Sequence, residues 1–145
     1  MFVRFGISES RGLIRGMDDH DLVRAATQAR SYAHVPYSGF KVGAAIEDEA
    51  GRIFTGCNIE NASFGLTMCA ERVAVFKAIS EGAGKLKHVA VVTDAESLTP
   101  PCGACRQILW EFCGNAELIL ANVAGARLRM PLGELLPRPF DSSSF

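Results

Sequence analysis

The sequence has no excess of either charge and no long hydrophobic run. Its 15 Lys and Arg residues nearly balance 16 Asp and Glu residues, which leaves a formal net charge of −1. Proteins that grip the phosphates of nucleic acid usually carry a basic surface, so this balance argues against a nucleic-acid partner. No apolar stretch approaches the roughly 20 residues that a membrane-spanning helix needs, and we therefore expect no membrane association.

The five cysteines cannot all pair within the chain, because their number is odd. Residues 1–16 also lack the continuous apolar segment of a secretory signal. We therefore expect residues 1–16 to be an N-terminal extension, residues 17–145 to form a single domain, and the protein to work in the cytoplasm, where thiols stay reduced. Cysteines in that setting are typically metal ligands, nucleophiles or core residues.

Hydrophobic periodicity and turn residues predict three helices and five strands. The helices are expected over 18–32, 69–80 and 103–112, and the strands over 42–46, 53–59, 89–93, 117–121 and 127–130. Their order predicts a three-layer α/β domain, in which the valine-rich strand 89–93 is covered on both faces. On the second helix, the spacing of Val73, Phe76 and Ile79 predicts that these three side chains face the core.

Three cysteines lie at the starts of two predicted helices. Cys69 begins one helix, and Cys102 and Cys105 form a C-x-x-C pair at the start of the next. Positions three apart share one face of a helix, and helices that follow strands begin at the same edge of a sheet, so the three sulfurs should converge. Three thiolates suit zinc, and three protein ligands leave the fourth tetrahedral position for water, as in catalytic sites.

Charged residues beside these cysteines favour a catalytic over a structural site. Glu71 lies two positions beyond Cys69, too close to be an easy ligand but near enough to act as a general acid/base on a metal-bound water. Arg72, and Arg106 as a second candidate, are expected to donate hydrogen bonds to the sulfurs and reduce their negative charge. The alternative is a zinc ion that only stabilises the fold, and in such a structural site a carboxylate at this position has no role.

The chain resembles the small, free-nucleoside cytidine deaminases in five blocks, which are PYSGFKVGAAI, GCNIENASFG, CAERVAVFKAISEG, VVTD and PPCGACRQIL. The resemblance covers about residues 18–140. It implies an α/β/α fold with a mixed five-stranded sheet, and a zinc ion held by Cys69, Cys102 and Cys105. It further implies that Glu71 moves the protons, and that the reaction converts cytidine and 2′-deoxycytidine to the uridine forms in pyrimidine salvage.

The resemblance also assigns residues to the nucleoside. It implies that Asn58 and Glu60 hold the ribose, that Phe40 packs near the nucleoside, and that the backbone of Ala70 contacts the base. Independently of the resemblance, Asn58 and Glu60 lie two positions apart at the end of the strand predicted over 53–59, and in extended backbone their side chains should point to one face. Cys57 should then point away from this pocket, which argues against a role as a fourth zinc ligand.

Two aromatic residues are assigned by the resemblance to contacts between subunits of a homotetramer with shared active sites. Phe140 matches a C-terminal aromatic residue that enters a neighbouring subunit's site. Phe64 stands where family members commonly carry tyrosine, and the missing hydroxyl removes one polar contact that a neighbour gives to the sugar.

Two other deaminase functions stay open. Enzymes that deaminate modified cytosine nucleosides such as blasticidin S resemble this core as well. Editing deaminases for tRNA or single-stranded DNA typically carry His where Cys69 stands, and they need a basic groove with stacking aromatic side chains. The near-neutral charge of this chain disfavours the editing function.

Overall fold

A mixed five-stranded sheet, with strand order β2-β1-β3-β4-β5, lies at the centre of this computed structural model, which describes residues 19–145. The strands are β1 (Gly43–Asp48), β2 (Ile53–Cys57), β3 (Leu86–Thr93), β4 (Glu117–Asn122) and β5 (Arg127–Pro131). Strands β3 and β4 are parallel, and the other neighbours are antiparallel. The predicted extension over residues 1–16 lies outside the described part of the chain.

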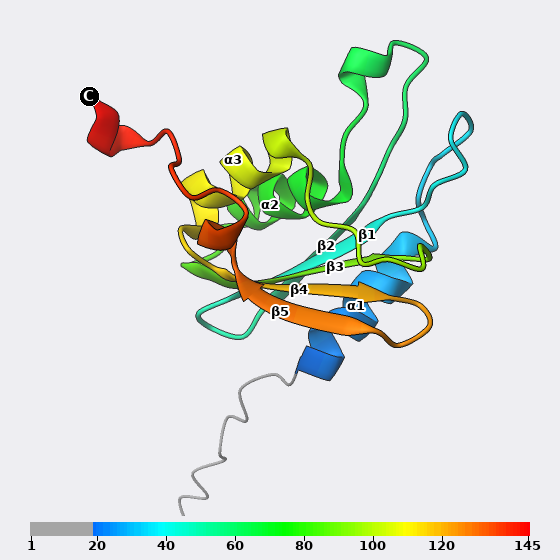
Figure 1. Cartoon of the computed structure of the whole chain (residues 1–145), viewed down its shortest axis with the longest axis horizontal. Helices are drawn as coiled ribbons and strands as arrows, with labels where there is room; N and C mark the ends of the chain where they lie inside the picture. The colour runs from blue at the N-terminus through cyan, green and yellow to red at the C-terminus, as the bar shows by residue number, and fades with distance from the viewer. Residues whose placement is uncertain (1–18) are drawn as a thin grey trace, which may run out of the picture.

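Helices cover both faces of the sheet (Figure 1). Helix α1 (Asp19–Arg30) lies on one face, and helices α2 (Ala70–Ser80) and α3 (Gly103–Cys113) lie on the other. Short 3-10 turns occur at Phe64–Leu66, Leu132–Glu134 and Ser142–Ser144. The predicted three-layer α/β/α architecture is confirmed. Within residues 19–145, no helix is long and apolar enough to cross a membrane.

The central strand β3 belongs to two separate cores. Val89 and Val91 pack in the core beneath α2 and α3, whereas Ala90 and Val92 pack in the core beneath α1. A strand that is buried on both faces needs no polar alternation, which explains its valine-rich sequence. The strand begins at Leu86, three residues before the predicted start, because pairing with β1 extends across polar residues that hide it in the sequence.

The prediction for the buried face of α2 was wrong. Phe76 and Ile79 are 42% and 45% exposed, and Val73 is only partly buried. The fully buried side chains of this helix instead include Ala74, Val75 and Ala78, none of which is as large as Phe76 or Ile79. Large apolar side chains therefore lie on the outer surface of this helix, where the sequence pattern alone placed them in the core.

Gly56 of strand β2 explains why α2 packs through small residues. A Cβ atom added at Gly56 would lie 2.5 Å from the carbonyl oxygen of Ala70 and 2.6 Å from the backbone nitrogen of Ala74. The helix backbone thus approaches the strand directly, and glycine is the residue that permits this distance. This contact sets the position of the first turn of α2, which carries Glu71 next to Cys69.

We expect the substitution Gly56→Ala to destabilise the protein by about 3 kcal/mol, because a Cβ that meets backbone atoms forces the helix and the strand apart. Thermal or urea unfolding measures this change. Gly65→Ala is the matched control, since a Cβ there would have no atom within 4 Å. Equal stability of the two variants would contradict the close packing of α2 on β2.

Candidate active site

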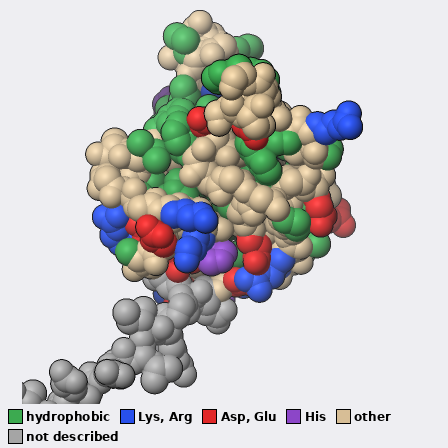
Figure 2. Space-filling model, turned by 90° about the vertical axis from the view of Figure 1, so that its left-hand side faces the viewer, with side chains coloured by type: hydrophobic (Ala, Val, Ile, Leu, Met, Phe, Trp, Pro, Cys, Tyr) green, Lys and Arg blue, Asp and Glu red, His purple; other side chains and the backbone are tan. Residues whose placement is uncertain are grey.

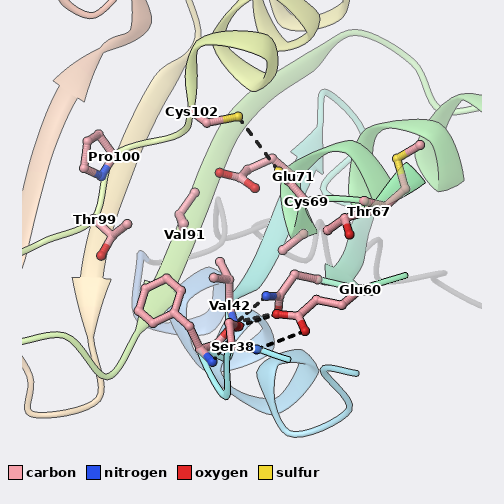
Figure 3. Close-up of a pocket in the computed structure, with 14 residues that line it drawn as sticks. Ser38, Val42, Glu60, Thr67, Cys69, Glu71, Val91, Thr99, Pro100 and Cys102 are labelled. Carbon is pink, nitrogen blue, oxygen red and sulfur yellow. Dashed lines mark hydrogen bonds between the residues drawn. The ribbon is translucent and has the colours of Figure 1, made fainter. Parts of the chain in front are cut away.

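The N-terminal ends of α2 and α3 bring three cysteines together at one edge of the sheet (Figure 3). Cys69 and Cys102 are the N-cap residues of the two helices, and Cys105 lies in the first turn of α3. Their three sulfur atoms all lie within 4.8 Å of one another. Neither N-cap side chain makes a capping hydrogen bond to its helix, so both sulfurs can serve as ligands.

The geometry of this cluster fits a zinc ion. Two sulfurs bound tetrahedrally at the usual Zn–S distance lie about 3.8 Å apart. The Sγ atoms of Cys69 and Cys102 are 3.9 Å apart. The positive ends of the two helix dipoles point at these sulfurs and favour their thiolate forms. Cys57 lies outside the cluster and lines a separate hollow together with Tyr32 and Lys77.

Hydrogen bonds already favour a thiolate at Cys69. Interactions with the Cys105 thiol, with Arg72, whose guanidinium donates from 3.5 Å, and with Cys102 lower the pKa of Cys69 to about 5. The pKa of Cys105 is raised by the neighbouring Cys69 sulfur and by burial of the side chain. Arg72 also donates to the carbonyl oxygen of Thr67, which fixes the guanidinium beside the cluster.

Arg106 does not make the predicted contact with a sulfur. It donates instead to the carbonyl oxygens of Pro101, at 2.8 Å, and Leu135, at 3.1 Å. Arg106 lies one residue beyond Cys105, which turns it by about 100° around the helix and away from the metal cluster. Its hydrogen bonds tie the loop that carries Cys102 to the segment after β5.

Glu71 is the buried carboxyl group of this site, with only 5% of its surface exposed. Burial raises its pKa to about 7. The Cys105 sulfur lies 3.8 Å from Oε2 of Glu71. Figure 3 shows the Glu71 carboxyl group beside the cysteines and directed into the pocket. A carboxyl group whose pKa is close to neutral can both accept and release a proton, which suits general acid/base chemistry.

The cysteine cluster opens into a cavity of about 300 Å³. Four residues that the sequence analysis assigned to a nucleoside line it, namely Phe40, Asn58, Glu60 and Ala70. Ser38, Thr67, Thr99 and Pro100 line it too, and the sequence analysis did not single them out. Ser38 lies two residues from Phe40, Thr67 two residues from Cys69, and Thr99 and Pro100 lie just before Cys102. This nearness in sequence to predicted site residues could have identified them.

Phe64 and Phe140 do not line this cavity in their own chain. Phe64 is 74% exposed, and its ring contacts that of Tyr37 at a centroid distance of 5.7 Å. Phe140 is 66% exposed and lies against the ring of Phe145. In Figure 1 both segments extend away from the body of the molecule, the loop with Phe64 beyond α2 and the C-terminal segment beyond α3.

Comparison with known proteins assigns this site to a family. A family model described as the cytidine and deoxycytidylate deaminase zinc-binding region matches residues 17–121. A cytidine deaminase of Halalkalibacterium halodurans is 49% identical over 125 residues, which are 86% of this chain and 95% of that protein. A cytidine deaminase of Mycobacterium tuberculosis is 46% identical over 123 residues, 84% of this chain and 90% of that protein.

Solved structures agree with the sequence comparison. The crystal structure of cytidine deaminase from Burkholderia pseudomallei matches with a TM-score of 0.83 and 44% identity, and the match covers 86% of this chain and all of that one. The cytidine deaminase of Mycobacterium tuberculosis matches with a TM-score of 0.75 and covers 98% of that chain. The chain therefore belongs to the zinc-binding cytidine deaminase family.

We expect Cys102→Ala to lose its zinc and to unfold more easily, because two thiolates of the cluster remain without the cation that offsets their charge. Metal analysis by mass spectrometry on the purified protein measures the zinc content. Cys57→Ser is the control, since Cys57 lies outside the cluster. A full zinc complement in Cys102→Ala would overturn the assignment of this ligand.

Proposed function

We propose that this protein catalyses the hydrolytic deamination of cytidine and 2′-deoxycytidine to uridine and 2′-deoxyuridine, with release of ammonia. The observation that carries this proposal is the buried Glu71 carboxyl group beside three clustered cysteines, at the floor of a cavity of about 300 Å³. A zinc ion that only staples a fold needs neither a cavity nor a buried carboxyl group beside it. The family to which the chain belongs supports the same reaction.

Cys69, Cys102 and Cys105 would hold the zinc ion, which when bound supplies Lewis-acid activation of water. Glu71 accepts a proton from the attacking water and passes protons to N3 of the cytosine ring and to the departing amine. The Glu71 carboxyl group lines the same cavity as Cys69 and Cys102 and is almost fully buried, which places it where it can receive and return these protons. Arg72 donates to Cys69 and offsets part of the negative charge of the thiolates.

Residues around the cavity supply the contacts for the nucleoside. In our proposal Asn58 and Glu60 bind the sugar and Phe40 packs against the nucleoside from the wall opposite Glu71, while the backbone of Ala70, on the same helix as Glu71, contacts the base. Support comes from position, since all four residues line the same cavity as Glu71 and Cys102. Figure 3 shows Glu60 across the cavity from Glu71, which leaves the space between them for a ligand.

We expect Glu71→Gln to keep its zinc and its fold but to lose deamination by at least about 10²-fold, because glutamine preserves the shape of the side chain and cannot shuttle protons. An ultraviolet assay of cytidine turnover, together with metal analysis, tests this. Glu81→Gln, at the exposed C-terminal end of the same helix, is the control and should retain full activity. Near-normal turnover by zinc-loaded Glu71→Gln would mean that another group carries the proton.

We further propose that the protein assembles as a homotetramer whose active sites are shared between subunits. Support comes from apolar side chains on the outer side of α2 and α3, where Phe76, Ile79 and Phe112 are each about 40% exposed. Phe76 and Phe112 also contact each other, which makes a continuous apolar surface. Figure 2 shows hydrophobic side chains spread over the upper part of one face, above a lower edge where charged side chains gather.

In this proposal Phe140 and the loop that carries Phe64 complete the site of a neighbouring subunit. Both side chains are exposed in the single chain, and neither lines the cavity that holds Glu71. The neighbouring subunit would close the open side of the cavity, because electrostatic interactions of zinc and Glu71 with the substrate are stronger when bulk water is excluded. Phe64 would give the sugar bound in a neighbouring subunit an apolar contact, and it has no hydroxyl group for a hydrogen bond.

We expect light scattering to give a mass of about four times the 15.6 kDa chain.

Phe140→Ala should raise the KM for cytidine about tenfold without loss of zinc, because the aromatic contact is removed and the zinc ligands are untouched. Phe145→Ala, which removes the ring that Phe140 touches, is the matched control. Co-expression of Phe140→Ala with Glu71→Gln chains should restore part of the activity, because one chain supplies the aromatic ring and the other the intact Glu71. An active monomer would contradict shared sites.

We also propose that the enzyme works in the cytoplasm, where its uridine product can re-enter the pyrimidine pool. The five cysteines are free thiols in the structure, and three of them lie close enough together to hold one metal ion. An oxidising compartment would favour disulfides between such close thiols over metal binding. The reducing conditions of the cytoplasm keep the ligands available.

A further inference from the structure

Ser38 lies in the cavity wall that faces the cysteine cluster, and its hydroxyl group makes two hydrogen bonds. It donates to Oε1 of Glu60 and accepts from the backbone nitrogen of Phe40 at 3.0 Å. A serine hydroxyl has a single proton, and the bond from Phe40 occupies one of its lone pairs. The backbone of Phe40 therefore fixes the rotation of the hydroxyl so that its proton points at Glu60.

The Glu60 carboxylate is largely occupied by the segment that contains Ser38. Its Oε2 atom accepts from the backbone nitrogens of Tyr37, at 2.8 Å, and Ser38, at 3.2 Å. Each carboxylate oxygen offers about two acceptor positions, so these bonds fill Oε2. The Ser38 hydroxyl takes one position on Oε1, and a single acceptor position is left for a ligand.

Asn58 holds the other side of the same segment. Its side-chain amide donates to the carbonyl oxygen of Phe40 at 2.8 Å and accepts from the backbone nitrogen of Val42 at 2.8 Å. The backbone of Phe40 is thus held at its nitrogen by Ser38 and at its carbonyl by Asn58. This segment is fixed before any ligand binds, which spares a ligand the entropy cost of ordering it.

We propose that Ser38 is a positioning residue, whose hydroxyl group orients the Glu60 carboxylate so that its one remaining acceptor position receives a ring hydroxyl of the substrate's sugar. The inference rests on the proposed function and deepens it. Ser38 acts through Glu60 on the sugar and takes no part in proton transfer, which belongs to Glu71 on the opposite wall. The same hydrogen bond is the main cause that lowers the pKa of Glu60, which keeps the carboxylate charged and a strong acceptor.

The test compares Ser38→Ala with the wild-type enzyme on cytidine and on 2′,3′-dideoxycytidine, whose sugar has no ring hydroxyl. The KM for cytidine should rise about tenfold, the loss expected for one hydrogen bond to a charged group, while kcat changes less than about twofold. For dideoxycytidine, the KM of the variant should stay within about twofold of that of the wild-type enzyme, since the interaction is already absent from the complex.

Two variants separate positioning from a purely structural role. Ser38→Thr keeps the hydroxyl group at an exposed position and should restore the KM for cytidine. Ser31→Ala removes one exposed serine hydroxyl that bonds only the carbonyl oxygen of Gln28, outside the cavity, and should leave both substrates unaffected. All variants should keep their zinc.

An equal rise in KM for the two substrates would overturn the inference, because Ser38 would then act through the fold of the Phe40 segment and not through the sugar. An unchanged KM for cytidine in Ser38→Ala would overturn it as well. In both cases the wild-type enzyme turns over cytidine, so the proposed function stands. A wild-type enzyme that holds zinc but leaves cytidine unchanged would instead overturn the proposed function, and with it this inference.

Discussion

The site depends on one structural constraint, which is the convergence of two helix N-termini on a single point at the edge of the sheet. Cys69 and Cys102 occupy equivalent N-cap positions, and Cys105 adds a third sulfur from the first turn of α3. Negative charge is stabilised at helix N-termini, so three thiolates can share this space. The close contact between Gly56 and the first turn of α2 holds one of these helix ends in place.

The two walls of the cavity are built in different ways. The wall with the cysteines and Glu71 belongs to helices that are packed on the core, and Glu71 itself is almost fully buried. The opposite wall consists of loops, whose Ser38, Asn58 and Glu60 side chains bond mainly to backbone groups. Hydrogen bonds there replace the hydrophobic packing that fixes the helices. A loop wall held by hydrogen bonds thus faces a helical wall held by packing, an arrangement that suits precise placement of a ligand.

Local sequence patterns predicted the order of elements and the convergence of the three cysteines, because turn residues, N-cap cysteines and a valine-rich strand are local signals. The same patterns placed Phe76 and Ile79 in the core, since helical periodicity identifies an apolar stripe but not which of two apolar sides meets the sheet. The small residues opposite Gly56 decide that question, and they come from a distant strand. Arg106 shows the same limit, because its partners Pro101 and Leu135 depend on tertiary packing. Ser38 was missed because its hydrogen bond spans 22 positions to Glu60.

The central claim is that the cysteine cluster and Glu71 form a hydrolytic deaminase site for cytidine. The most direct measurement follows uridine and ammonia together when the zinc-loaded wild-type protein is incubated with cytidine, before and after removal of the metal with a chelator. We predict one ammonia per uridine, loss of both products without zinc, and recovery when zinc is restored. A protein that carries one zinc ion per chain and forms no uridine would contradict the account. So would a protein that retains full activity without metal.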